Sequence, residues 1–187
     1  MSLQTWQETL ISSQIDGTAV TTTTPGTSLL PPAAVLTLPA NYFQIGKVLR
    51  LNMFGRIGNR NASTDTITFN LKFGATVVAA SQAIPLNAIG KTTVPFWLQW
   101  LLTCRSIGNS ALATMMHQGI FHSETVIGAP AVAAGGGGIM QIPAGAPAVG
   151  TGFDSTVALT VDLFAFWNAA NASNTMLSHQ YILEALN

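Results

Sequence analysis

Apolar and polar residues alternate along most of the chain after residue 45, and this period of two predicts β-strands. In residues 48–57 the alternation places Leu49, Leu51 and Met53 on one face. Arg50, Asn52, Phe54 and Arg56 then point to the opposite face, because successive side chains of a strand alternate. Residues 66–73 repeat the pattern, with aliphatic and aromatic residues on one face and Thr, Asn and Lys on the other.

Further strands are predicted over residues 76–80, 155–167 and 175–186. In the last of these, Leu177, His179 and Tyr181 are expected to share the buried face, so we interpret His179 as a core histidine. Residues 93–103 and 110–121 are apolar on both faces, which is typical of strands covered on two sides. Near the start, residues 16–24 form one more predicted strand, whereas Leu3, Trp6 and Leu10 give a weak helical signal.

Turn-forming residues separate these segments at 58–65, 85–91, 106–109 and 168–174. About eight strands in a chain of this length favour an all-β fold, a single antiparallel β-sandwich of the jelly-roll type. We therefore expect one domain over residues 1–187. Residues 1–13 would form a short N-terminal arm or helix.

Residues 126–150 interrupt the strand pattern with seven glycines and three prolines. Such a composition breaks a helix, so the segment is not a membrane-spanning helix. This segment also contains apolar residues that are expected to pack against another surface: Ile127, Ile139, Met140 and Ile142. We expect a long glycine-rich loop laid over the sandwich or over a neighbouring subunit, with a mobile loop as the alternative.

The chain carries few charges, and this changes the picture of its surface. It has 7 basic and 7 acidic residues, 7% in all, where about 25% is usual. A monomer of this mass exposes roughly 8,600 Å² by surface scaling. So few ionic groups predict that protein partners cover part of this surface. The 48% apolar content excludes a disordered chain, and the zero net charge argues against a nucleic-acid partner.

The sequence gives no sign of export or of disulfide bonding. Cys104 is the single cysteine, so no intrachain disulfide can form. Residues 1–14 lack a basic segment followed by an unbroken apolar run, so we expect no signal peptide.

No motif supports catalysis, a cofactor or a metal. Gly90, Lys91 and Thr92 resemble the end of a phosphate-binding loop, but the position of its first glycine is occupied by Pro85. His117 and His122 would face opposite sides of one strand, and His122 with Glu124 supplies only two ligands. We therefore predict no catalytic, cofactor-binding or metal-binding residues.

The tryptophans and two arginines are the candidate contact residues. Trp97 and Trp100 could stack on sugars, but within apolar strands a core or a subunit interface is favoured. With the apolar residues of the glycine-rich segment they give this candidate interface: Ile127, Ile139, Met140, Ile142, Trp97 and Trp100. Arg50 and Arg56 are expected to pair with acids such as Asp65, Asp162 or Glu184 and so to set orientation.

Four segments together resemble a family of small virion structural proteins, of head-decoration or minor-capsid type, in tailed bacteriophages and prophages. Spread over roughly residues 38–187, they are "LPANYFQIGKVLRLNMFGRI", "VPFWLQWLLTCRSIG", "PAVGTGFDSTVALTVDLFAFW" and "HQYILEALN". The resemblance implies a non-enzymatic particle component, a β-sandwich that assembles as an oligomer on the capsid or tail. It brings no catalytic residues.

These observations lead to a ranked set of functions. The first is a capsid decoration or cement subunit in the virion, assembled in the host cytoplasm. It would bind copies of itself, with a trimer as one option, and the major capsid protein or other virion proteins. The second is a receptor- or glycan-binding module of a tail fibre or spike, which would need exposed aromatic residues beside polar ones. The third is an enzyme such as a polysaccharide depolymerase.

Overall fold

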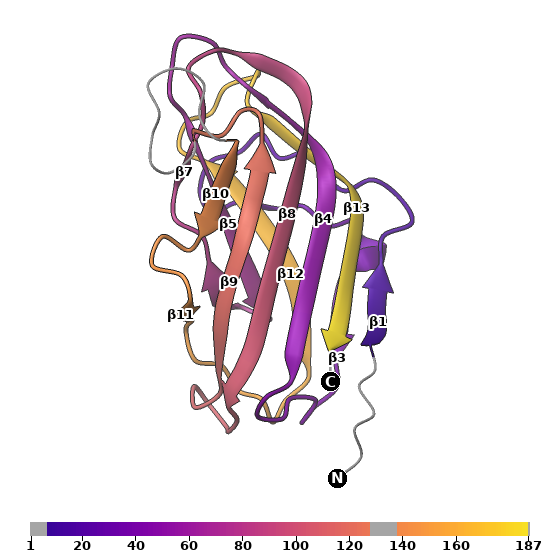
Figure 1. The fold of residues 1–187 in the computed structure, drawn as a ribbon. Coiled ribbons are helices and arrows are strands. Elements are labelled where there is room, and N and C mark those ends of the chain that lie inside the picture. Colours follow the sequence, from indigo (N-terminus) through magenta and orange to yellow (C-terminus); the bar gives the residue numbers. More distant parts are fainter. Residues whose placement is uncertain (1–6, 128–137, 187) are drawn as a thin grey trace.

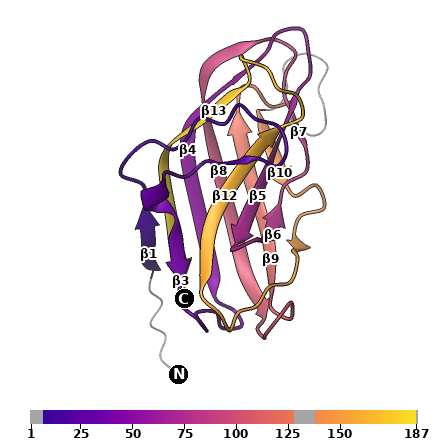
Figure 2. The ribbon, with the colours of Figure 1, turned by 180° about the vertical axis from the view of Figure 1, so that it is seen from behind.

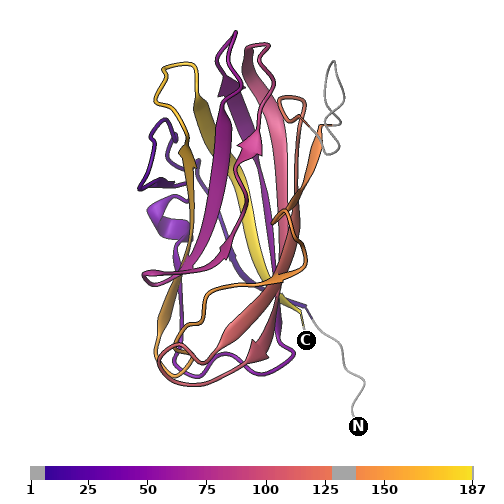
Figure 3. The same ribbon diagram turned by 90° about the vertical axis from the view of Figure 1, so that its left-hand side faces the viewer.

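The computed structural model describes residues 7–127 and 138–186, which fold into two antiparallel sheets packed face to face (Figures 1 and 3). Sheet A contains, in spatial order, β1 (Gln7–Ser12), β13 (Thr175–Leu186), β4 (Val48–Asn59), β8 (Lys91–Ser106), β9 (Thr114–Ser123) and β10 (Ile139–Ile142), and β11 (Ala148–Val149) also pairs with β9. Sheet B, nearer the viewer in Figure 2, contains β12 (Leu159–Trp167), β5 (Thr66–Phe73) and β6 (Thr76–Ala80). Its short strands are β2 (Thr27–Ser28), β3 (Leu36–Leu38) and β7 (Ile84–Pro85), and the 3-10 turn η1 (Pro32–Ala34) precedes β3.

The connectivity is that of a jelly roll. Sheet A contains the order β1-β13-β4-β8, and in sheet B β3 and β5 flank β12, with β6 beyond β5. The first and last strands are therefore neighbours, and the chain crosses repeatedly between the sheets, as two interleaved Greek keys require. Strands β9, β10 and β11 are inserted between β8 and β12 and widen sheet A. The expected all-β, jelly-roll-like sandwich is confirmed, although the shortest strands were not predicted.

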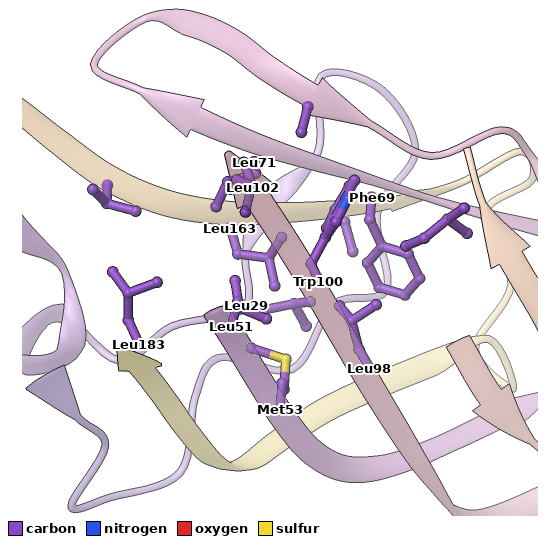
Figure 4. Packing of buried hydrophobic residues seen from close by; sticks show 14 of the residues in the cluster. Leu29, Leu51, Met53, Phe69, Leu71, Leu98, Trp100, Leu102, Leu163 and Leu183 are labelled. Carbon is purple, nitrogen blue, oxygen red and sulfur yellow. The ribbon is translucent and has the colours of Figure 1, made fainter. Parts of the chain in front are cut away.

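The core lies between the sheets and follows the predicted alternation. All of the inward side chains of β5 are at most 1% exposed, as are Leu49, Leu51 and Met53 of β4. Each fully buried aliphatic side chain of this size contributes about 1.5–3 kcal/mol relative to exposure. Residues from both sheets meet in Figure 4, where the labelled ones are Leu29, Leu51, Met53, Phe69, Leu71, Leu98, Trp100, Leu102, Leu163 and Leu183.

The prediction that residues 93–103 and 110–121 are covered on two sides was wrong. In β8, Leu98, Trp100 and Leu102 are fully buried, whereas Trp97 and Leu101 are only half-buried. The described residues place no second layer over the outer side of sheet A. The apolar residues on that side therefore remain accessible.

The predicted alternation also failed in the first half of β13. A β-bulge between Ser178 and Gln180 shifts the pairing with β4, so Ser178 points inward and His179 does not. His179 is partly exposed, and its Nδ1 lies 2.9 Å from Asp16 Oδ1. The interpretation of His179 as a core histidine was thus wrong. After the bulge, Tyr181, Leu183 and Ala185 are buried in regular alternation.

The N-terminal predictions need correction too. The expected arm or helix is, over Gln7–Ser12, an edge strand that pairs with β13; residues 1–6 lie outside the described residues. In the predicted strand over 16–24, only Val20 pairs, in a single bridge to Met176. Hydrogen bonding to the free edge of β13 decides where the chain becomes extended, which local periodicity does not report.

The glycine-rich segment is only partly a loop. Residues 128–137 lie outside the described residues, and no conclusion applies to them. After them, β10 and β11 pair with β9, and Ile142 and Met140 pack into the sandwich at 0% and 9% exposure. Residues 139–142 and 148–149 of the predicted 126–150 loop therefore extend sheet A. Pairing with the edge of β9 satisfies their backbone groups.

Candidate functional site

The two outer faces of the sandwich differ in chemistry. On sheet B the outward residues of β5 are polar, and Lys72 Nζ lies 3.7 Å from the centroid of the Phe164 ring of β12. The outer side of sheet A, here called the A face, carries partly or fully exposed apolar side chains on every strand from β13 to β11. They are Val48, Phe54, Trp97, Leu101, Met116, Ile120, Ile139, Val149 and Ile182. Four of these side chains, Phe54, Ile139, Val149 and Ile182, are well exposed, whereas the outward Phe164 and Phe166 of sheet B are half-buried. The A face is therefore the candidate functional site.

Two aromatic rings lie at the middle of the A face. Phe54 and Trp97 are partners across β4 and β8. Their ring centroids are 6.2 Å apart and their planes are within 5° of parallel. Phe54 is 43% exposed, and the indole Nε1 of Trp97 hydrogen-bonds to none of the described residues. The pair presents a continuous aromatic surface to the outside.

Neutral amides accompany the apolar residues. Asn52 and Gln99 are the next cross-strand pair along β4 and β8, and Gln99 Nε2 donates to Asn52 Oδ1 at 3.1 Å. Ile182 lies beside Asn52 and Ile120 lies beside Gln99 in the same row. The A face therefore combines apolar contact area with groups that donate and accept hydrogen bonds without charge.

One ion pair lies at the edge of this surface. Arg50 Nε donates to Glu184 Oε2 at 2.7 Å, and Gln7 Nε2 of β1 donates to the other carboxylate oxygen. Glu184 is one of the acids expected to pair with the arginines. Arg56 behaves differently: its Nη1 donates to the carbonyl oxygen of Thr93 at 3.0 Å, and no carboxylate partner is found for it within residues 7–127 and 138–186.

Two adjoining hollows indent the A face. One of about 400 Å³ is lined by Arg50, Gln99, Gln118 and Gln141 among others, and one of about 220 Å³ shares Leu101 and Gln118 with it. His117 borders the smaller hollow and is 3% exposed. Trp100 Nε1 donates to His117 Nδ1 at 3.3 Å, which requires a neutral ring, and burial lowers the pKa of His117.

The structure separates the predicted interface residues into two groups. Trp100 and Ile142 are fully buried and Met140 nearly so; these three pack inside their own chain, so their assignment to an interface was wrong. Trp97 and the 49%-exposed Ile139 lie on the A face, and Ile127, the last residue described before the gap at 128–137, is half-buried. Sequence reasoning missed Phe54, Leu101, Ile120 and Ile182. The outward position of Phe54 between Arg50 and Arg56 was the available signal.

The described residues contain neither a metal-binding cluster nor a membrane-spanning helix. Among residues 7–127 and 138–186 no group of three or more His, Cys, Asp or Glu side chains is arranged to hold a metal ion. His122 is exposed while His117 points into the sandwich, as their spacing predicted. No helix in the described part of the chain has the length and apolar character needed to cross a bilayer.

Comparisons with known proteins do not assign the chain to a family. No protein-family model and no curated protein matches the chain. Among solved structures it is similar to one described as the CBM2 module of the evolved Dit of Lactobacillus casei BL23 phage J-1, at 12% sequence identity and a TM-score of 0.39, covering 99% of this chain and 98% of that one. A likeness at this TM-score carries no argument about function.

Proposed function

We propose that the chain is a non-enzymatic structural subunit of a phage particle, of the capsid decoration or cement type, and that it acts by burying the A face against neighbouring subunits. The observation that carries this proposal is the contrast between the outer faces. Among the described strands, large apolar side chains that are well exposed occur only on sheet A, at Phe54, Ile139, Val149 and Ile182. The outward Phe164 and Phe166 of β12 in sheet B are half-buried. Monomeric proteins rarely expose contiguous apolar surfaces of this kind, and where such surfaces occur they usually mark interaction sites.

The scarcity of charge supports the same proposal. The described residues expose 8902 Å², close to the value expected for one compact chain, with seven basic and seven acidic residues to solvate it. On the A face the row that contains Asn52 and Gln99 has no charged member between Ile182 and Gln141. Burying such a row removes water without stranding ions, which keeps the desolvation cost low.

The partners proposed are further copies of the chain, as a homo-oligomer with a trimer as one option, together with the major capsid protein or other virion proteins. Burying 1,000 Å² of apolar surface gives on the order of 25 kcal/mol before association costs, which offset much of it. Because apolar area supplies this free energy, binding should respond weakly to salt.

Light scattering of the purified chain, followed by its titration onto undecorated particles at low and high salt, tests the proposal. We expect a mass above that of one chain or binding to particles, with an affinity that changes little with salt. A monomer that binds no particle, or binding that is lost steeply at high salt, contradicts it. Electron cryo-microscopy of the intact particle would locate the subunit.

A second candidate, a receptor- or glycan-binding module of a tail fibre or spike, is favoured by one specific observation. That function requires exposed aromatic rings beside polar side chains, and Phe54 with Trp97 lies next to Asn52 and Gln99. Aromatic rings stack on the apolar faces of sugars while amides bind their hydroxyls. A glycan array distinguishes the candidates: hits lost in Trp97→Ala support the module, and an empty array eliminates it.

A further inference from the structure

A third hollow lies at one end of the sandwich, away from the A face. Its lining residues lie where β4 ends and where β8 and β13 begin. These strand ends are at the top of Figure 1. Its volume is about 610 Å³, within the range of about 300–1,000 Å³ typical of small-molecule sites. The residues that matter for its chemistry are Asn61, Lys91, Thr92, Thr93, Ser173 and Thr175.

A bulge in the β4–β8 pairing builds one wall of this hollow. Ile57 pairs with Val94 and Asn59 with Lys91, so Thr92 and Thr93 lie opposite a single residue of β4. Thr93 adopts a φ of 58°, which is rare for a β-branched residue, and Arg56 Nη1 holds its carbonyl oxygen at 3.0 Å. Such backbone strain persists only where surrounding contacts impose it, and it concentrates at functional sites. Both threonine side chains are exposed.

The base of the hollow is closely packed and rigidly held. A Cβ on Gly58 would lie 3.1 Å from Thr175 Oγ1 and 3.2 Å from the Ser173 carbonyl oxygen, so glycine lets β4 approach the start of β13. Asn59 is 2% exposed, and its Nδ2 donates to the carbonyl oxygens of Asn87 at 2.6 Å and Ile89 at 3.3 Å. These bonds anchor the loop before β8, so the hollow is formed without a ligand.

The lining consists mainly of hydroxyl and amide groups, and the charge of its lysine is compensated by a nearby carboxylate. Its one cation, Lys91, lies 3.5 Å from Glu124 Oε1. Ile89 adds an apolar side chain that is 62% exposed. Hydroxyl and amide groups both donate and accept hydrogen bonds, which suits a ligand with many hydroxyls and no net charge. A charged ligand would have to break the Lys91–Glu124 pair or remain unpaired.

We infer that this hollow binds one residue of a neutral saccharide, with Thr92, Thr93 and Ser173 on its hydroxyls and Ile89 against an apolar ring face. The inference depends neither on the assembly role of the A face nor on the Phe54–Trp97 pair. A particle subunit could therefore assemble through its side and bind a glycan at its end.

Nuclear magnetic resonance titration of the full chain with glucose, galactose, N-acetylglucosamine, rhamnose and N-acetylneuraminic acid, each at millimolar concentration, tests the inference. A neutral sugar is expected to shift the backbone amides of Gly58, Gly90, Thr92 and Ser173. Shifts confined to the A face, no binding of any sugar, or binding of N-acetylneuraminic acid alone would overturn it.

Two variants and a matched control sharpen the test. The double variant Thr92→Ala/Ser173→Ala removes two exposed hydroxyls and should weaken binding about tenfold or more. Ser173→Trp, which fills the hollow, should abolish it. Thr18→Ala/Thr21→Ala removes two exposed hydroxyls elsewhere and should leave affinity unchanged. Unaltered sugar affinity in both hollow variants would refute the site. Particle binding and the mass of the assembly should be the same as for the parent in all three variants.

Discussion

Arg50 and Glu184 are direct partners across β4 and β13, and their side chains form an ion pair with a Nε–Oε2 distance of 2.7 Å. The Glu184 side chain is only 10% exposed, and Gln7 of β1 donates to its second oxygen. One carboxylate therefore connects three neighbouring strands of sheet A. Because Glu184 of the last strand also accepts from Gln7 of the first strand, this carboxylate helps to align the two ends of the described chain.

Removing the cation should destabilise the fold. In Arg50→Met a largely buried carboxylate loses its charged donor, and we expect the free energy of unfolding to fall by about 1–3 kcal/mol. Urea denaturation monitored by tryptophan fluorescence measures it. Arg56→Met is the matched control, since Arg56 contacts a backbone carbonyl at the surface, and its effect should stay within about 0.5 kcal/mol. Equal losses in both variants would contradict the role of the pair.

The two tryptophans of β8 should differ sharply although they are three residues apart. Trp100 is fully buried, so Trp100→Ala should cost about 3–5 kcal/mol of stability. Trp97 lies half-buried on the A face, and Trp97→Ala should cost clearly less, because a smaller part of the ring leaves a packed environment. Thermal unfolding of both variants under one condition gives the comparison. A larger loss for Trp97→Ala would show that the face assignment of β8 is wrong.

Association should depend on the A face. Phe54→Ser/Ile182→Ser replaces two exposed apolar residues, at 43% and 37% exposure, and should lower the mass measured by light scattering or prevent particle binding. The melting temperature should change little. Ile45→Ser/Val157→Ser, which alters two exposed apolar residues elsewhere, is the control and should assemble normally. Assembly that survives the first variant and fails in the second would place the contact surface elsewhere.

The buried histidine should make stability dependent on pH. Burial lowers the pKa of His117, so the folded state favours the neutral ring more than the unfolded state does. The neutral His117 ring therefore contributes fully to the free energy of unfolding above the unfolded pKa of about 6.5. This contribution is lost progressively as pH falls below that value. His117→Gln should lose this dependence. Unfolding free energies of both proteins across this range test it; parallel curves would exclude His117 as the source.

Asp162 should behave in the opposite sense. Burial raises its pKa, against the smaller lowering effects of the Ser28 hydrogen bond and of Lys72. The folded state thus favours the protonated form of Asp162. This preference stabilises the fold below the unfolded pKa of about 3.9, and the stabilisation is lost as pH rises through the folded pKa. Asp162→Asn keeps an acceptor for Ser28 Oγ, which lies 2.6 Å from Oδ1. It should melt higher than the parent at neutral pH, with the gain shrinking below pH 4.

The candidate contact residues show which side-chain orientations the sequence could predict and which it could not. Alternation in residues 48–57 placed Arg50 on the outward face, where the structure has it. Trp97 and Ile139 were selected for their apolar character, and they are outward residues. Trp100 and Ile142 were selected for the same apolar character, and they are core residues. In a segment that is apolar at nearly every position, periodicity does not tell which face meets the other sheet.

The all-β class, the positions of the long strands and the inward faces of β4 and β5 could all be predicted from the sequence. These follow from the pleat of an extended chain, which alternates side chains whatever lies nearby. Its shortage of charge likewise needed no structure to be seen. Three features could be seen only in the folded chain: β1 joins β13, a bulge turns His179 outward, and the A face has no covering layer among the described residues. Pairing and register are set by hydrogen bonds between residues far apart in the chain, and a shift of one residue exchanges the two faces of a strand.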